Sequence, residues 1–197
     1  IECLASNWNR NINLLTYRMG QETGTLQMSV EAKILNETES ARNWIGFRLA
    51  AKGEFNDYRD DAIYGTGLNA GITTNGELFI GDTPVKYVKN AEGVRPYLKE
   101  GVVLKVSATP NGDKYNVEIT ATRKANNELL ASEQVEDIPG ETFFGSIGLV
   151  SDFNEVKDKE VPSVVFANWE ASGTKLISHG ERAFGPVLFT QYTLSRG

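Results

Sequence analysis

Cysteine and histidine are almost absent from this sequence, which contains one residue of each type among 197. The single cysteine, Cys3, excludes an internal disulfide, and we interpret it as an incidental thiol rather than as a site of lipid attachment. The single histidine, His179, excludes a zinc site that requires several histidine ligands within this chain. Only His179 could serve in a Ser-His-Asp triad, and its polar, turn-like surroundings predict an exposed loop residue instead.

The sequence also lacks an excess of positive charge and lacks long apolar runs. Its formal net charge is −6 and its Lys and Arg residues form no cluster, whereas nucleic-acid-binding proteins use basic surfaces to neutralise phosphates. We therefore expect no nucleic-acid partner. No apolar run approaches the roughly 18 residues that a membrane-spanning helix requires, so we expect no membrane span. Glycine-rich phosphate-binding motifs and tandem repeats are also missing.

What the sequence does contain is alternation of apolar and polar residues, within a composition that is 40% hydrophobic and 23% charged. A period of two is typical of strands that bury one face. One such segment has apolar residues at every second position from Leu26 to Ala32, and another alternates from Trp44 to Leu49. Further strands are expected at Leu129–Val135, Ser146–Asp152 and Ser163–Ser172.

Two hairpins are indicated by Asn-Gly pairs that lie between alternating arms. These pairs are Asn75-Gly76 and Asn111-Gly112, and the Asn-Gly sequence supplies the positive φ angles that tight hairpin turns require. Many short strands separated by turns, in a chain with weak helix signals, favour an all-β fold. The predicted fold class is therefore an antiparallel β-sandwich of the jelly-roll type.

The predicted organisation has three parts. Residues 1–25 form an N-terminal segment, either a short helix or irregular structure, and residues 26–175 form the sandwich. Residues 176–197, which include the strand-like VLFTQYTL, form a terminal strand or the lead into a downstream domain.

The predicted loop at 54–64, between the strand at 44–49 and the first hairpin, is the strongest candidate for a binding site. It combines aromatic and charged residues in a predicted loop, and loops on a rigid scaffold often carry function. Tyr58 and Tyr64 would stack on sugar rings while Asp57, Arg59 and Asp60 hydrogen-bond to sugar hydroxyls. In the alternative interpretation, the aromatic residues pack the loop onto the sandwich and Arg59 pairs with the acids.

Two further hypotheses concern neighbouring residues. Asp57, Asp60 and Asp61 supply hard oxygen ligands, so a calcium site in the loop is an alternative to sugar binding. Trp44 and Arg48 lie on one face of their predicted strand, where they would either flank a ligand or, for Trp44, fill the edge of the core.

Three segments resemble known proteins. They are WIGFRLAAKGEFNDYRDDAIYGTGLNAGITTNGELFIGD, then GSIGLVSDF followed by VVFANWEASG, and finally RAFGPVLFTQYTLSRG. The second resembles the closing strands of concanavalin A-like and laminin-G-like jelly rolls. Together the three resemble the N-terminal region of bacterial alkaline-phosphatase-D-like metallophosphoesterases. The resemblance implies a periplasmic or extracellular all-β module, with surface attachment as a variant, that precedes a catalytic domain outside this chain.

The leading functional hypothesis is a noncatalytic accessory module of a secreted hydrolase, with no catalytic residue of its own. It would bind a glycan or glycoconjugate, or pack on the catalytic domain downstream. The alternative is a glycosidase with a dispersed carboxylate pair, since the Glu-x-Asp-x-x-Glu strand of laminarinase-type enzymes does not occur here. A third alternative is a purely structural domain.

Overall fold

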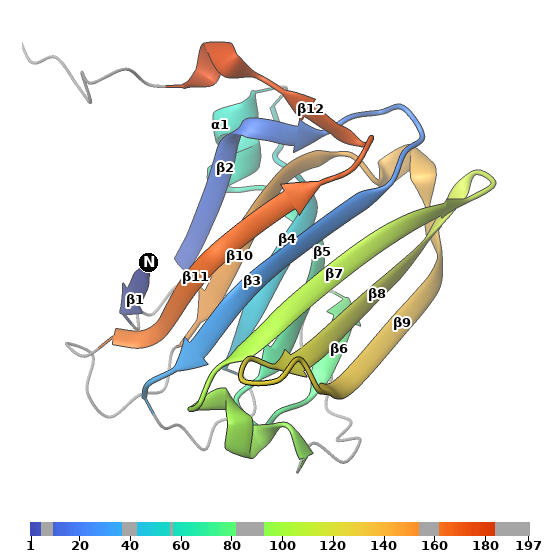
Figure 1. Cartoon of the computed structure of the whole chain (residues 1–197). Helices are drawn as coiled ribbons and strands as arrows, with labels where there is room; N and C mark the ends of the chain where they lie inside the picture. The colour runs from blue at the N-terminus through green and yellow to red at the C-terminus, as the bar shows by residue number, and fades with distance from the viewer. Residues whose placement is uncertain (5–9, 37–42, 56, 82–92, 154–161, 184–197) are drawn as a thin grey trace, which may run out of the picture.

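In the computed structural model, residues 1–4, 10–36, 43–55, 57–81, 93–153 and 162–183 can be described. This part of the chain forms two six-stranded antiparallel sheets that pack face to face (Figure 1). In spatial order, the first sheet consists of β1 (Glu2–Leu4), β11 (Pro162–Ser172), β3 (Leu26–Ile34), β7 (Val102–Asn111), β8 (Lys114–Arg123) and β9 (Leu129–Pro139). The second consists of β12 (Leu176–Ser178), β2 (Arg10–Met19), β10 (Gly145–Asp152), β4 (Trp44–Lys52), β5 (Thr66–Thr73) and β6 (Leu78–Gly81).

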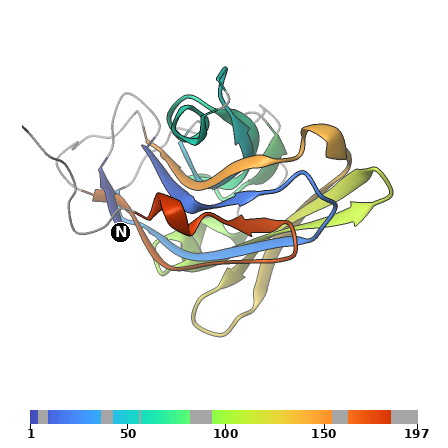
Figure 2. The same cartoon turned by 90° about the horizontal axis from the view of Figure 1, so that it is seen from above.

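Helical structure in the described residues is limited to short pieces. One α-helix, α1 (Tyr58–Ile63), lies on the side of the second sheet that faces away from the first sheet (Figure 2). Three 3₁₀ turns are η2 (Arg95–Leu98), η3 (Gly140–Thr142) and η4 (Gly180–Arg182). None of the described helices is long and apolar enough to cross a membrane. The predicted all-β sandwich is thus confirmed.

The core lies between the two sheets and follows the alternation seen in the sequence. Buried and more exposed positions alternate along β3, as the period of two predicts. Its buried residues Met28 and Val30 belong to one apolar cluster with Leu104 of β7 and with Phe47 and Leu49 of β4. The inner faces of both sheets therefore meet in a single core.

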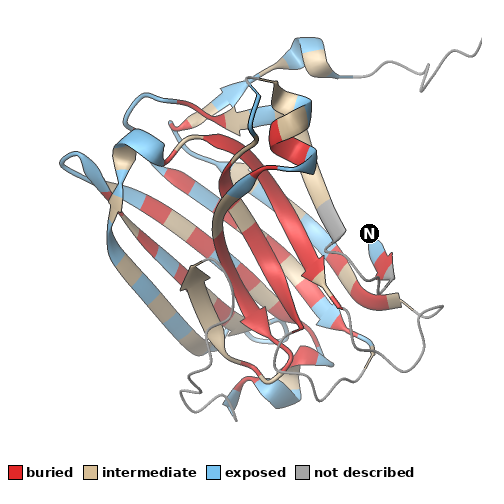
Figure 3. Ribbon diagram, turned by 180° about the vertical axis from the view of Figure 1, so that it is seen from behind, coloured by how far each residue is buried: buried red, intermediate tan, exposed pale blue. Residues whose placement is uncertain are grey.

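The outer faces of the two sheets differ strongly. In the first sheet, the outward positions of β3, β7 and β8 are exposed or half-buried and, apart from Val103, polar. In the second sheet, β4 and β10 are buried on both faces, as the central strands in Figure 3 show. Part of this cover comes from α1, which contacts β2, β4 and β10.

The β5–β6 hairpin is confirmed where Asn75-Gly76 predicted it. The N–H of Gly76 donates to the carbonyl of Thr73 at 2.9 Å, and the N–H of Thr73 donates to the carbonyl of Glu77 at 2.9 Å. The turn therefore has three residues and ends on Gly76, whose φ of 89° requires the freedom of glycine. Gly76, and not Asn75, has the positive φ.

The β7–β8 hairpin is also confirmed, but its turn lies one residue further along than Asn111-Gly112 implied. Asn111 pairs with Lys114, so the two turn residues are Gly112 and Asp113. Gly112 has a φ of 64° at the first turn position, which is the arrangement of a type II′ turn.

Two expectations about secondary structure were wrong. The N-terminal segment expected as a short helix or irregular structure contains β1 and β2, and β2 pairs with β10 and β12 inside the second sheet. The segment expected as a loop at 54–64 contains α1. At the other end, β12 begins at Leu176, while the strand-like VLFTQYTL lies outside the described residues.

A buried lysine, Lys175, links the β11–β12 connection to the β2–β3 connection and to β8. Lys175, which is 1% exposed, donates from Nζ to the hydroxyl oxygen of Tyr115 at 2.9 Å and to the carbonyl of Glu22 at 3.1 Å. The same hydroxyl oxygen accepts the N–H of Gly24 at 3.1 Å. Among the described residues, Lys175 has no carboxylate partner, so the Tyr115 hydroxyl and the aromatic rings nearby stabilise its charge.

We predict that Tyr115→Phe lowers the free energy of unfolding by about 2–3 kcal/mol, because it removes the acceptor from a buried ammonium and a buried N–H. Urea denaturation measures the change. Tyr64→Phe, which removes an exposed hydroxyl, is the matched control and should cost less than about 0.5 kcal/mol. Lys175→Met should cost less in the Tyr115→Phe background than alone. Equal costs for the two tyrosine variants would contradict this role.

Candidate ligand-binding site around α1

The sequence DYRDDAIY supplies α1 and its two cap residues, and its first residues satisfy the N–H groups and the dipole of a helix N-terminus. Asp57 has extended backbone angles and its Oδ1 accepts the N–H of Arg59 at 2.9 Å, which makes it the N-cap. Asp60 and Asp61 lie in the first turn, where negative charge is favourable. The helix ends at Ile63, and the C-cap residue Tyr64 donates its N–H to the carbonyl of Asp60 at 2.9 Å.

One side of α1 is fixed to the second sheet. Asp61 is buried; its Oδ1 accepts the N–H of Gly53 at 2.9 Å and its Oδ2 lies 3.4 Å from the guanidinium of Arg18. The neighbouring Ala62 is also buried, and its carbonyl accepts a hydrogen bond from Nδ2 of Asn13 at 3.0 Å. These contacts hold the helix at a defined position and turn its other side outward.

The three aspartates of the calcium hypothesis have separate partners. Asp57 pairs with the guanidinium of Arg59 at 2.6 Å, and Asp60 Oδ2 accepts the N–H of Phe55 at 2.9 Å. Asp61 has the partners described above. The described residues contain no group of three or more His, Cys, Asp or Glu placed to hold a metal ion, so the structure gives the calcium alternative no support.

The Asp57–Arg59 pair lies on the surface and dominates the titration of Asp57. The hydrogen bonds from the Arg59 side chain, followed by that from the Arg59 N–H, lower the pKa of Asp57 from 3.8 to about 2. The predicted pairing of Arg59 with an acid is therefore present in the structure.

The aromatic residues, in contrast, do not all pack onto the sandwich. Tyr64 is 76% exposed, Phe55 is 65% exposed, and Ile63, which precedes Tyr64 in the sequence, is also 65% exposed. The half-buried ring of Tyr58 has the guanidinium of Arg182 at 4.3 Å from its centroid and that of Arg59 at 5.8 Å. We call Phe55, Tyr58, Arg59, Ile63 and Tyr64, with Asp57, the α1 patch.

Trp44 and Arg48 lie on the same outer face of the second sheet that carries α1, but both are engaged. Trp44 is 2% exposed, and its Nε1 donates to Oδ2 of Asp152 at 3.1 Å. Nε of Arg48 donates to Oδ1 of Asn69 at 3.0 Å, and burial lowers the pKa of Arg48 while Asp152 opposes that effect. In this conformation the Trp44 ring is not available to stack on a sugar.

The register explains why Trp44 is buried on an outer face. Its ring meets Phe79 of β6 edge-on, with 5.1 Å between ring centroids. A Cβ at Gly71 would lie 2.8 Å from Cε3 of Trp44, so glycine makes room for the ring. The side chains of Trp44 and Arg48 therefore pack and hydrogen-bond within the protein beside α1, and they do not form the surface that would contact a ligand.

Sequence reasoning missed the partners of Trp44 and Arg48 on this outer face of the second sheet. Asp152, Asn69 and Phe79 come from three other strands, and only the strand register shows that they share a face with Trp44. Glu77 was missed as well. It follows the β5–β6 turn, burial raises its pKa, and within the described structure its Oε1 is buried without a hydrogen-bond partner.

The glycosidase alternative requires two carboxyl groups at a defined separation, and two carboxylates on this outer face can be tested for it. Glu77 next to β6 and Asp152 of β10 lie on the same row, but β5 and β4 are between them. At about 4.8 Å per strand the backbone positions are roughly 14 Å apart, beyond the roughly 5–9.5 Å between glycosidase carboxyl groups. Trp44 also lies between them. The described carboxylates of this row thus give no support to a catalytic pair.

We predict that Glu77→Gln stabilises the protein at about pH 7. Burial raises the pKa of Glu77 in the folded state above its ordinary value of 4.5. At pH values above 4.5 the folded state therefore binds more protons than the unfolded state, and the free energy of unfolding falls as the pH rises through the folded pKa. The gain from Glu77→Gln should therefore vanish below about pH 4, where the carboxyl is protonated in both states. Urea unfolding at both pH values measures it, with the exposed Glu128→Gln as control. A gain that does not depend on pH would contradict the assignment.

A second prediction concerns Asp57. A carboxyl ¹³C NMR titration should give a pKa near 2, and Arg59→Gln should raise it most of the way to 3.8 because the side-chain hydrogen bonds are its largest cause. A midpoint near 3.8 in the unsubstituted chain would show that the Asp57–Arg59 pair does not persist in solution.

Comparison with known proteins was made by sequence and by structure. No protein-family model and no curated protein sequence matches this chain. Among solved structures, lectin I-B4 from Griffonia simplicifolia in its metal-free form is similar over 88% of this chain and 86% of its own, with 9% identity and a TM-score of 0.53.

Two other solved structures match less well. Lectin II from Ulex europaeus covers 77% of this chain and 74% of its own, with 9% identity and a TM-score of 0.44. An alginate lyase of polysaccharide lyase family 7 covers 80% of this chain and 62% of its own, with 13% identity and a TM-score of 0.39. The likeness to the Griffonia lectin shows the fold alone: this chain is a concanavalin A-like jelly roll.

Proposed function

We propose that this chain is a carbohydrate-binding β-sandwich module and that the α1 patch contacts the glycan. The observation that carries the proposal is the exposure of Tyr64 and Phe55, at 76% and 65%, beside a helix that is fixed to the sheet. An exposed aromatic ring on a rigid support can stack on the apolar face of a sugar ring with little loss of conformational entropy.

The polar groups next to these rings suit the hydroxyls of a sugar. Asp57 and Arg59 hold each other at the surface and present an acceptor and donors from one position. Tyr58 is oriented by Arg182 and Arg59, so its hydroxyl has a defined location on the same helix. The patch thus combines aromatic and hydrogen-bonding groups as sugar sites do. That a lectin shares the fold agrees with this assignment.

We further propose that the module belongs to a larger secreted hydrolase, a metallophosphoesterase of the alkaline-phosphatase-D-like kind, in the periplasm or outside the cell. This proposal rests on the three sequence segments that resemble such enzymes. Two-metal phosphoesterases need clustered histidine, aspartate and asparagine ligands, and a chain with one histidine does not supply them. The metal-binding catalytic domain would lie elsewhere in the parent protein.

A second candidate function is docking onto that catalytic domain. The observation that favours it is the exposure of Ile63, at 65%, since an aliphatic side chain contributes to a protein interface more readily than to a sugar contact. The experiment below separates the two functions because only one of them requires a glycan.

We predict that glycan-array binding and calorimetry detect a glycan whose affinity falls about tenfold or more in Tyr64→Ala and in Phe55→Ala, since each removes a stacking ring. Tyr64→Phe keeps the ring and should retain most of the affinity. Leu129→Ala is the control, because Leu129 is a 60%-exposed apolar residue on β9 of the other sheet. Binding that survives both alanine substitutions would remove the α1 patch from the proposal. Binding to a separately produced phosphoesterase domain, without any glycan bound, would favour docking.

A further inference from the structure

The outer face of the first sheet carries a second polar site, on the side of the sandwich away from α1. Strand pairing places Gln27, Ser107 and Glu118 in one row across β3, β7 and β8. The next row contains Lys105 of β7 opposite Thr120 of β8. Residues that pair directly share a face of the sheet, so all five side chains project outward together.

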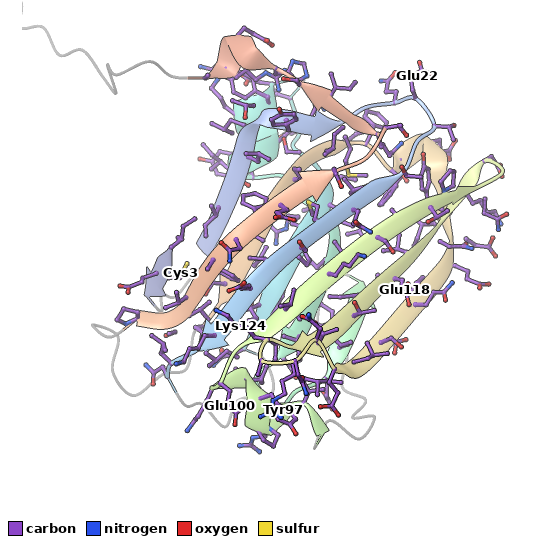
Figure 4. All side chains as sticks on the ribbon, in the orientation of Figure 1. Cys3, Glu22, Tyr97, Glu100, Glu118 and Lys124 are labelled. Atoms are coloured by element: carbon purple, nitrogen blue, oxygen red, sulfur yellow. The ribbon has the colours of Figure 1, made fainter. Side chains whose placement is uncertain are left out.

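These five residues line a hollow of about 120 Å³. Its shape follows from side-chain length. Ser107, on the central strand, is short and half-buried, while Gln27 and Glu118 on either side are long and exposed. Figure 4 looks onto this face of the sheet, with Glu118 labelled on β8.

The side chains around the hollow have no partners within the described part of the chain. None of the five makes a side-chain hydrogen bond there, and neither Lys105 nor Glu118 is in an ion pair, although they occupy diagonal positions on adjacent strands. Elsewhere on this face, Glu31 does have charged and polar partners. Nζ of Lys124 lies 2.6 Å from Oε2 of Glu31, and Nδ2 of Asn168 donates to Oε1 of Glu31 at 2.8 Å. The unpaired groups of the hollow therefore remain free for a ligand.

The chemistry of the lining selects one class of ligand. Lys105 offers only donors and Glu118 only acceptors, whereas Gln27 and the hydroxyls of Ser107 and Thr120 offer both. The formal charges of Lys105 and Glu118 cancel, so the lining has no net charge with which to select an anion or a cation. A neutral ligand with several neighbouring hydroxyl groups can donate to and accept from this set at once.

We propose that this hollow, lined by Gln27, Lys105, Ser107, Glu118 and Thr120, binds one residue of a neutral sugar through its hydroxyl groups. The lining contains no aromatic ring, so binding depends on hydrogen bonds and is weak for a single sugar. The site is separate from the α1 patch and does not depend on it. On a long glycan, two sites on opposite faces of one module raise the effective concentration of the second contact.

The test is an NMR titration of ¹⁵N-labelled protein with the methyl glycosides of glucose, galactose and mannose. At least one should produce saturable shifts at the amides of Ser107, Glu118 and Thr120, with a dissociation constant of about 1 mM. Glu118→Gln and Lys105→Met should each weaken this binding about tenfold, because each removes a hydrogen bond to a charged group. Raising the salt concentration should change the affinity little, since the ligand is neutral.

The controls separate this site from the α1 patch and from loss of folding. Lys33→Met on β3 and Glu128→Gln in the β8–β9 turn remove the same charges outside the lining and should leave the titration unchanged. Tyr64→Ala should also leave it unchanged, while Glu118→Gln should leave binding at the α1 patch intact. The proposal is overturned if no methyl glycoside shifts these amides. It is also overturned if only inorganic phosphate or glycine does so, since the ligand would then be charged.

Discussion

The apolar contact between the inner faces of the two sheets is the constraint on which the rest of the structure depends. Phe47 and Leu49 of β4 are fully buried in one cluster with Val30 of β3 and Leu104 of β7. Each such side chain contributes about 1.5–3 kcal/mol relative to exposure. Because strand side chains alternate, burying these residues also decides which residues point outward, and every candidate binding residue on a strand owes its position to this contact.

The two outer faces expose different kinds of side chain, and each of the two proposed binding sites depends on the residues that its face exposes. On the second sheet, Trp44 is buried, Arg48 is half-buried, and both are hydrogen-bonded. The exposed side chains of the candidate site on that side therefore come from α1 and the residues next to it. On the first sheet, the outward residues are mostly polar, and among the described residues Lys105 and Glu118 form no ion pair. One face thus presents aromatic rings on a helix, and the other presents hydroxyl, amide and charged groups on strands.

Local sequence predicted the secondary structure correctly wherever short-range rules applied, that is, wherever the conformation depended on neighbouring residues alone. The alternation around Val30 and the glycine of each Asn-Gly pair identified strands and hairpins correctly, since both depend on neighbouring residues alone. Such rules failed for 58–63, where Asp57 caps a helix that needs the second sheet to support it, and for β2, whose strand is stabilised by β10 and β12. In the candidate site, the Asp57–Arg59 pair was foreseeable because the residues are two apart, whereas the contacts of Arg182 with Tyr58 and of Asp152 with Trp44 were not.

By itself, the sequence determined the fold class, the hairpin glycines and the scarcity of catalytic side chains, because composition and the period of two act within a few residues. Tertiary structure alone decided which face each strand turns outward, that Trp44 is covered and Tyr64 exposed, and that Lys105 and Glu118 border one hollow. The physical reason is register. Cross-strand neighbours are set by how distant segments pair, and a shift of one residue would reverse every side chain between core and surface.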